Sequence, residues 1–473
     1  MVFSSAVFLF AFLPAVLLLY FLPLCFWNRR LEEHRRNLVL CGASLIFYAW
    51  GEPVYIILML LSIGFNFNVG LDIERSSDHP KARKRIVTAA VIFDLLLLGF
   101  FKYSNFIIGN INHIPSVDIP LLNVSLPVGI SFYTFQILSY VIDVYRGKVK
   151  AQRNIVSFAM YIAMFPQLIA GPIVQYADIE KQLFGRKHTP EKFLDGVIVF
   201  IRGLGKKVIF ANTIGAMHTE ILAGGSEGLS AASAWLAAVC YTMQIYFDFG
   251  GYSDMAIGLG RMFGFEFMQN FNFPYTAVSI KDFWKRWHIS LSGWFRDYVY
   301  IPLGGSRRGT ARTILNLAIV WSLTGLWHGA AWNFVAWGAF YGLLLILEKY
   351  PLAGIVPKIP VWIRHITTMI IVTVGWVFFS SDSIGSAFDL LGSMFLVNGN
   401  AAADPQCVYY FRNCGFPLML MSLSGFGGYA RVPKPRNRYL ATACSVCLYG
   451  AIMALCVICL VSDTYNPFLY FRF

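Results

Sequence analysis

The stretch at residues 313–347, TILNLAIVWSLTGLWHGAAWNFVAWGAFYGLLLIL, contains no Asp, Glu, Lys or Arg side chain. As one α-helix it would be about 52 Å long at 1.5 Å per residue, whereas the hydrocarbon core of a bilayer is about 30 Å thick. The run is typical of membrane helices, but it must be broken to fit. HGAAWN around Gly329 is the expected break, which leaves the titratable His328 at the end of a span, near a turn buried in protein.

The whole chain is apolar enough to need lipid as part of its solvent. Of its 473 residues, 57% are hydrophobic and only 13% are charged, against roughly 25% charged residues in soluble domains. Apolar segments that approach the ~20 residues of a membrane span lie at 6–27, 53–70, 86–101, 126–145, 231–247, 313–347, 361–380 and 440–461. With the shorter apolar pieces included, we expect about ten to thirteen crossings.

The charges predict how these spans are oriented. The formal net charge is +13, but the basic residues cluster in short links between apolar segments, at 28–37, 74–85 and 146–155. Because Lys and Arg mark cytoplasmic loops, these links are expected inside the cell and the N-terminus outside. The charge therefore indicates membrane topology, and no nucleic-acid partner is expected.

The end of the chain follows the same rule. The basic link at 431–438 is expected inside, so the last span, 440–461, leads to an extracytoplasmic tail at 462–473. Both termini outside implies an even number of crossings. We find no internal repeat, and we predict one polytopic domain over residues 1–473 with its core at about 120–350.

Two aspartates interrupt an apolar stretch in the middle of the chain. QIYFDFGGYSDMAIGLGRMFGFEF, residues 244–267, places Asp248 and Asp254 around a Gly-Gly pair. Ionisable residues in membrane segments usually face a protein interior or a wet cavity. Alternatively, these aspartates cap helices that are broken at the glycines. For Asp254 both interpretations stay open.

A third stretch mixes aromatic and basic side chains. SIKDFWKRWHISLSGWFRDYVYIPLGG, residues 279–305, has the pattern of a helix that lies in the membrane interface or dips into it. An ordinary anchor helix would explain its tryptophans and lysines. It would not require His288, which follows Trp287. A histidine on an apolar face is commonly a core residue, so the residues alone do not decide between packing and catalysis.

The cysteines do not indicate a metal site. CSVC and CVIC, within the segment 440–461, have the spacing of zinc ligands. Both lie in one apolar span, where no loop can fold the two pairs around an ion. We expect packing cysteines and no bound metal.

Taken together, five stretches resemble the membrane-bound O-acyltransferase family, and specifically its alginate O-acetylation branch. In chain order they are MVFSSAVFLFAFLP (1–14), PQLIAGPI (166–173), QIYFDFGGYSDMAIGLGRMFGF (244–265), the whole of 279–305, and LTGLWHGAAWNFVAWG (323–338). The resemblance implies an all-α polytopic membrane protein, with a ring of tilted and broken transmembrane helices around a central tunnel. One departure is Ala331, where the branch commonly has Asn.

The resemblance also implies roles for the two histidines. The invariant histidine of the family falls on His328, and its second conserved polar position falls on His288. Acyl transfer from a thioester to a hydroxyl needs a base with a pKa suited to the task, and donors for the developing oxyanion in a water-poor site. We expect His328 to be the base, and His288 to orient the donor or to supply a second hydrogen bond.

The donor implied by the resemblance is acetyl-CoA or an acyl-carrier thioester. The basic interface stretch is expected to hold its phosphates on the cytoplasmic side. The residues predicted to bind the donor or to line the tunnel are Lys285, Arg286, Arg296, Trp287, Trp327 and Asp254.

The C-terminal tail suggests an acyl carrier. FLYFRF, residues 468–473, resembles the terminal aromatic motif in the small partner protein of the related D-alanylation system. By that resemblance Tyr470 accepts the acetyl group at the His328 centre and offers it on the outer face. A phenol ester is an activated acyl donor, since a phenol has a pKa of about 10. The alternative is a tail that its aromatic residues anchor at the interface.

The sequence thus predicts an O-acetyltransferase of the bacterial cytoplasmic membrane that passes acetyl from a cytoplasmic thioester toward an extracytoplasmic polysaccharide. The resemblance implies an SGNH-hydrolase-like partner that places acetyl on sugar hydroxyls, with membrane lipid around the chain. Two alternatives remain. One is D-alanyl transfer to teichoic acid. The other is a transporter of acyl donors or lipid-linked sugars, which intramembrane aspartates and broken helices would suit, although transporters commonly have repeated halves.

Overall fold

The computed structural model describes residues 1–22, 29–225, 228–427 and 438–462, and all regular structure within these ranges is helical. The prediction of an all-α polytopic membrane protein is confirmed. The backbone divides into two compact units. Unit 1 comprises Met1–Phe200 and Asp254–Met268, and unit 2 comprises Ile201–Ser253 and Gln269–Phe473. The predicted single domain and the predicted ring around a tunnel stay predictions.

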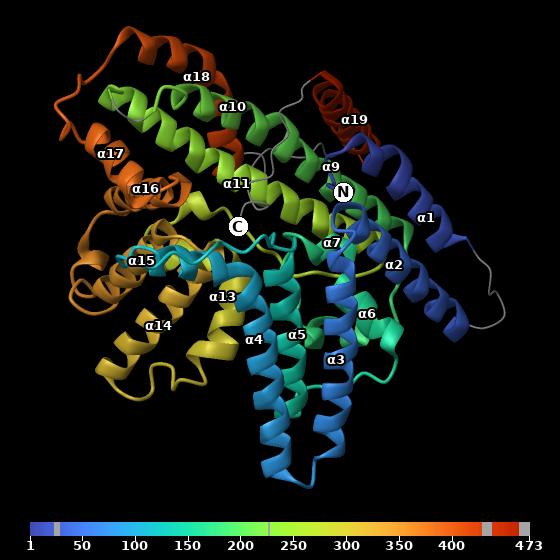
Figure 1. Ribbon diagram of the computed structural model, residues 1–473. Helices are drawn as coiled ribbons and strands as arrows, with labels where there is room; N and C mark the ends of the chain where they lie inside the picture. The colour runs from blue at the N-terminus through green and yellow to red at the C-terminus, as the bar shows by residue number, and fades with distance from the viewer. Residues whose placement is uncertain (23–28, 226–227, 428–437, 463–473) are drawn as a thin grey trace. The chain divides into compact units, whose positions relative to one another are not determined.

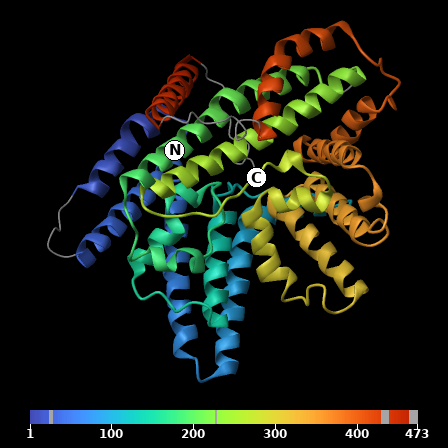
Figure 2. The ribbon, with the colours of Figure 1, turned by 180° about the vertical axis from the view of Figure 1, so that it is seen from behind.

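Unit 1 is built from the N-terminal helices and the end of α11. Its elements are η1 (Phe8–Phe12), α1 (Leu13–Phe21), α2 (Arg29–Gly51), α3 (Tyr55–Arg75), α4 (Pro80–Ile111), α5 (Ile130–Arg146), α6 (Ile155–Ala163), α7 (Phe165–Leu168), α8 (Tyr176–Ile179), η2 (Glu180–Gln182) and most of α9 (Pro190–Gly205). Helices α3, α4 and α5 lie side by side (Figures 1 and 2). Polar pairs join them inside: Asn66 donates to Asp94 at 2.9 Å, and Lys102 donates to Ser131 at 3.3 Å.

Unit 2 holds two of the three stretches that the sequence singles out, together with residues 244–253 of the aspartate stretch, whose residues 254–267 belong to unit 1. Its elements are η3 (Lys206–Ala211), α10 (Asn212–Ile221), most of α11 (Ala231–Met262), η4 (Pro274–Thr276), α12 (Ile280–Arg286), α13 (Ile289–Phe295), η5 (Arg296–Tyr300), α14 (Thr310–His328), α15 (Trp332–Lys349), η6 (Val356–Lys358), α16 (Val361–Ser380), α17 (Ile384–Met394), α18 (Pro405–Gly425) and α19 (Arg438–Ser462).

Each predicted apolar segment is mostly helical in its described part, with residues 126–129 and 329–331 as non-helical stretches. Helices α3, α4, α16 and α19 are long and apolar enough to cross a membrane, and the run Phe8–Phe21 is a shorter apolar helix. Only 6% of the apolar window of α19 is buried by protein, so this helix has most of its surface available to lipid. The chain is a multi-pass membrane protein, and the predicted total of crossings stays a prediction.

The predicted break in the run 313–347 is confirmed. Helix α14 ends at His328, Gly329 is extended with φ −166°, and α15 begins at Trp332. The two helices then pack closely through glycines. A Cβ added at Gly325 would lie 2.4 Å from the Phe334 carbonyl oxygen. Small residues at such contacts let membrane helices approach backbone to backbone, and the hairpin therefore holds His328 at a defined turn.

The stretch 279–305 differs from the single interface helix that its pattern predicts. Helix α12 ends at Arg286, and a new helix begins at Ile289. Between them His288 has left-handed backbone angles, φ 45° and ψ 55°, which are uncommon for a residue with a side chain. The break turns Trp287 and His288 toward the core, and both side chains are buried there.

Candidate functional site

His328 lies at the C-terminal end of α14 and is enclosed by aromatic rings. Its side chain is 3% exposed. Ring centroids of Trp327 and Trp337 each lie 5.0 Å from its imidazole, and that of Phe379 lies 5.2 Å away. All three contacts are edge-on, an arrangement that aromatic pairs favour. The hairpin turn and α16 together keep this imidazole away from bulk water.

These rings belong to a larger set that we call the aromatic shell. Its members come from α12, α14, α15 and α16, with one between α12 and α13: Trp284, Trp287, Trp321, Trp327, Trp337, Tyr341, Trp376 and Phe379. A shell of this kind excludes water, and hydrogen bonds and charges act more strongly where water is excluded. It therefore provides the water-poor surroundings that acyl transfer requires.

The second histidine of the sequence prediction reaches the same shell. His288 is 1% exposed, and its ring packs edge-on against Phe249 at 4.7 Å between centroids. The Trp327 ring lies 6.0 Å from the His288 ring and 5.0 Å from the His328 ring. The structure thus brings the two histidines to one tryptophan, although they are forty positions apart in the chain.

Asn270 holds His288 in its unusual backbone conformation. The backbone N–H of Ile289 donates to the Asn270 carbonyl at 3.0 Å. The Asn270 side-chain oxygen lies 3.2 Å from His288 Nδ1 and accepts from the Ser290 backbone N–H at 3.2 Å and from the Ser290 hydroxyl at 2.9 Å. Its amide nitrogen donates to Ser253 Oγ at 3.1 Å. Surroundings that fix a residue in a sparsely populated conformation are common at functional sites.

These bonds assign the tautomer of His288. A backbone N–H can only donate, so the atom of Asn270 that faces Ser290 is the carbonyl oxygen. That oxygen can only accept, so Nδ1 of His288 carries the proton that lies between them. In the neutral ring Nε2 then has a lone pair. This Nε2 is buried and has no hydrogen-bond partner among the described residues, so it is available to a substrate.

The three basic residues predicted to bind the donor lie on α12 and η5, and none of them is buried as the two histidines are. Lys285 is exposed on α12. Arg286 pairs with Asp282 at 2.9 Å, and Arg296 pairs with the adjacent Asp297 at 2.7 Å. Neighbouring carboxylates thus offset the charges of both arginines, whereas no ion pair of Lys285 occurs within the described ranges.

The other predicted site residues have different positions. Trp287 and Trp327 belong to the aromatic shell. Asp254 is half-buried on the part of α11 that belongs to unit 1. Tyr470 lies outside the described residues. Asp248 is buried in an ion pair with Lys207 at 2.8 Å, so its charge is compensated within the protein.

Asn270 is a site residue that could not be selected from the sequence. It stands in FEFMQNFNFP, where Asn270 and Asn272 are equally plausible as loop residues. Asn270 is fully buried, and a buried amide must find partners, but burial is not visible in a short local pattern. As to metals, within the described ranges no three His, Cys, Asp or Glu side chains gather as a metal centre requires.

Comparison with known proteins identifies relatives that span most of the chain. The family model of the membrane-bound O-acyltransferase family, MBOAT, matches residues 149–383, which include both histidines. The chain is 43% identical to a probable alginate O-acetylase AlgI of Pseudomonas aeruginosa, over 84% of this chain and 75% of that protein. It is 38% identical to a protein of the same name from Pseudomonas putida, over 100% of both. A peptidoglycan O-acetyltransferase of Helicobacter pylori is 35% identical, over 84% of this chain and 80% of that protein.

Proposed function

From the premise that this chain belongs to the membrane-bound O-acyltransferase family and is an O-acyltransferase, we propose that it transfers acetyl from a thioester to an extracytoplasmic polysaccharide. The names of the relatives support acetyl as the group that moves, because O-acetylation is common to the alginate and peptidoglycan proteins. The same names support a polysaccharide acceptor. Membership of an enzyme family sets aside the transporter alternative.

The observation that carries the proposal is the pair of buried histidines, His288 and His328, beside Trp327. Nε2 of His288 has no hydrogen-bond partner among the described residues. In this proposal His328 removes the proton from the acceptor hydroxyl. The hydroxyl oxygen then forms a bond to the thioester carbonyl carbon, and the carbon–sulfur bond breaks. The proton on His328 passes to the departing thiolate, so the histidine ends as it began.

His288 fits the role of orienting the donor. Its Nε2 is an acceptor in the neutral ring, because Nδ1 donates to Asn270. The pantetheine arm of acetyl-CoA and of acyl carriers has an amide N–H close to the thioester, and this group can donate to Nε2. Binding there would place the thioester carbonyl at a fixed position, which lowers the entropic part of the barrier.

The hydrogen bond to the developing oxyanion is better assigned to a tryptophan than to His288. Trp337 is fully buried beside His328, and its indole N–H has no acceptor among the described residues. An indole nitrogen can only donate. We assign to it the developing oxyanion of the tetrahedral intermediate, for which a donor held in a dry site is effective.

The remaining parts of the proposal concern direction and partners. The basic links support a protein of the bacterial cytoplasmic membrane with both termini outside, which accepts acetyl from inside. Lys285 supplies the exposed charge for donor phosphates, with smaller contributions from Arg286 and Arg296. Tyr470 carries acetyl to an extracytoplasmic SGNH-hydrolase-like partner. Asp254 stays a proposed tunnel residue.

The test is polymer acetylation in cells that express His328→Ala in place of the natural chain. We expect acetate on the polymer to fall at least about a hundredfold, the lower range for loss of a general base. His113→Ala is the matched control, because His113 is exposed and its ring bonds to the nearby Gly109 carbonyl at 2.7 Å, a contact within its own helix end. Full acetylation by a His328→Ala protein that is inserted at normal levels would refute the role.

A second variant tests the tail. Tyr470→Phe keeps the aromatic ring and removes the hydroxyl that would be acetylated. We expect polymer acetate to be lost while the purified variant still binds the donor. Unchanged acetylation would reduce Tyr470 to an interface anchor. Measurement of D-alanine on the polymer in the same cells decides the alternative donor, since D-alanine in place of acetate would favour D-alanyl transfer.

A further inference from the structure

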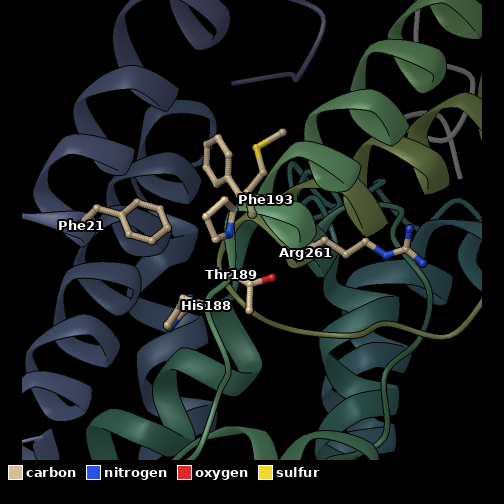
Figure 3. Close-up of a pocket in the computed structure, with 7 residues that line it drawn as sticks. Phe21, His188, Thr189, Phe193 and Arg261 are labelled. Atoms are coloured by element: carbon tan, nitrogen blue, oxygen red, sulfur yellow. The ribbon is translucent and has the colours of Figure 1, made fainter. Parts of the chain in front are cut away.

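A pocket in unit 1 lies at the end of α1, the loop before α9 and the end of α11 (Figure 3). Its volume is about 460 Å³, within the roughly 300–1,000 Å³ typical of small-molecule sites. A second hollow shares His188 and Thr189 with it and continues toward α2. We call the two together the His188 pocket. Its first part is mostly apolar and its second part is mostly charged.

The charged part contains a buried arginine whose bonds all go to neutral groups. Arg186 is 7% exposed. It donates to the Asn37 side-chain oxygen at 2.5 Å and to the carbonyls of Gln182 and Leu183 at 3.2 and 3.3 Å, and its guanidinium lies 4.4 Å from the Phe265 ring centroid. Its Nε has no partner among the described residues. Tyr20 also bonds to this guanidinium and Glu33 favours its charge, but no described carboxylate forms an ion pair with Arg186. A buried cation without an ion pair is costly, so this site favours an anionic ligand.

Other charges at the same wall support this sign. Lys187 is exposed at the rim and Arg36 lines the wall, while Glu32 and Glu33 are the acidic members. Glu32 already accepts hydrogen bonds from Arg35 and Arg36 at 2.9 and 3.0 Å. Burial lowers the pKa of His188 to about 4, with further lowering by Arg36, Arg186 and Lys192. The neighbouring cations thus create a positive potential at this imidazole.

The apolar part suits a hydrocarbon chain. Phe21, Phe193 and Met262 line it, and the Phe21 and Phe193 rings meet edge-on with centroids 5.7 Å apart. Arg261 contributes only its stem, because its guanidinium pairs with Asp195 at 2.5 Å and points away from the pocket (Figure 3). Leucines on α1 beside this part are exposed, among them Leu18 at 68%. In a membrane protein this surface faces lipid.

We propose that the His188 pocket binds an anionic glycerophospholipid, with its phosphate at Arg186 and Lys187 and the start of its acyl chains at Phe21 and Phe193. A phosphate ester is also present in the thioester donor, so phosphate chemistry alone does not identify the ligand. The lipid is favoured because Phe21, which lines the apolar part, lies on α1 one turn from the exposed Leu18. The basic link at 28–37 places the pocket in the cytoplasmic leaflet by the positive-inside rule.

The test measures lipid that stays on the full-length protein. The chain is purified from mixed phosphatidylglycerol and phosphatidylcholine vesicles, and native mass spectrometry counts retained molecules of each lipid. We expect the wild type to retain phosphatidylglycerol in preference. Lys187→Gln is expected to weaken this retention about fivefold and Arg186→Gln about tenfold or more, since a charge-assisted bond is stronger than the attraction of a surface charge.

Two controls keep the result decisive. Lys181→Gln removes an exposed lysine from the same region without touching the pocket, and it should leave retention unchanged. Because Arg186 also holds Asn37, its variant can fail for structural reasons, and Lys187→Gln then carries the test alone. Equal retention by Lys187→Gln and Lys181→Gln would overturn the proposal.

Competition separates the sources of phosphate. Glycerol phosphate, which has the head group without chains, and coenzyme A are each added to the wild-type complex at millimolar concentration. A bound lipid should be displaced by neither. Displacement by coenzyme A would assign the pocket to the donor and overturn the lipid, and displacement by glycerol phosphate would show that the chains contribute nothing. The readout is binding, so it stands whether or not the proposed acetyl transfer fails.

Discussion

His288 and His188 show how differently one side chain behaves in two parts of this molecule. His288 is fully buried among aromatic rings, and the neutral amide of Asn270 fixes which of its nitrogens carries the proton. His188 is partly buried beside cations, and its burial first and the charges of Arg36, Arg186 and Lys192 second lower its pKa and keep it neutral. The first environment offers a lone pair in a dry site and suits group transfer. The second offers positive potential and suits the binding of an anion.

The largest expected difference between the two is in activity. His288→Ala should lower acetyl transfer at least about a hundredfold, because it leaves the donor thioester misplaced and a misplacement of about 1 Å costs roughly that much in rate. His188→Gln, the paired control, should stay within twofold because its pocket has no part in the reaction. Both are measured as acetate on the polymer at equal amounts of inserted protein. A His288→Ala protein with normal activity would break the comparison.

Asn270 is the residue that distinguishes the two environments, and its variants sharpen the comparison. Asn270→Ala leaves Nδ1 of His288 without its acceptor. The imidazole is then misplaced, and we expect the rate of acetyl transfer to fall roughly a hundredfold. Asn270→Asp restores the acceptor but adds a negative charge, which favours the protonated imidazole. For this variant we expect partial rescue, with the acidic limb of the pH–rate profile moved to higher pH. Two variants with equal rates and unshifted profiles would leave Asn270 a structural role only.

The hairpin that presents His328 gives a prediction on stability. Gly338→Val adds a side chain where α14 and α15 touch. A Cβ at position 338 would lie 2.5 Å from the Trp321 carbonyl oxygen, so the two helices must separate. Overpacking of this kind costs about 1–3 kcal/mol. The variant should melt at lower temperature in detergent. Gly64→Ala on α3 is the control, because nothing lies within 4 Å of the added Cβ. Equal melting of the two variants would contradict the close contact.

The smallest expected effect is a change in how stability depends on pH. The pKa of His188 is about 4 in the folded chain against 6.5 for an ordinary histidine. Above pH 6.5 both the folded and unfolded states are neutral. As the pH falls from 6.5 toward 4 the unfolded state gains the proton first, so stability declines with acid. His188→Gln should show a shallower decline in melting temperature over this range. An identical slope would mean that burial and the neighbouring cations do not lower the pKa of His188.

The parts of the fold that follow from length and polarity were predictable from the sequence. The uncharged run 313–347 had to break, and it breaks at Gly329. The segment 361–380 coincides with α16. The stretch 279–305 was predicted as one helix, and the break at His288 depends on Asn270, eighteen positions earlier. Such long-range pairing leaves no periodic signal. The ion pairs of Arg286 and Arg296 could have been predicted from the sequence, since each partner lies within four residues.

The central claim is that His328 serves as the base of acyl transfer, and single-turnover thioester cleavage tests it most directly. Purified protein is mixed with acetyl-CoA and a soluble hydroxyl acceptor, and free thiol is measured over time for wild type and His328→Gln. We predict that both bind the donor equally, while the variant releases thiol at least about a hundred times more slowly. Equal rates of thiol release with equal binding would contradict the account.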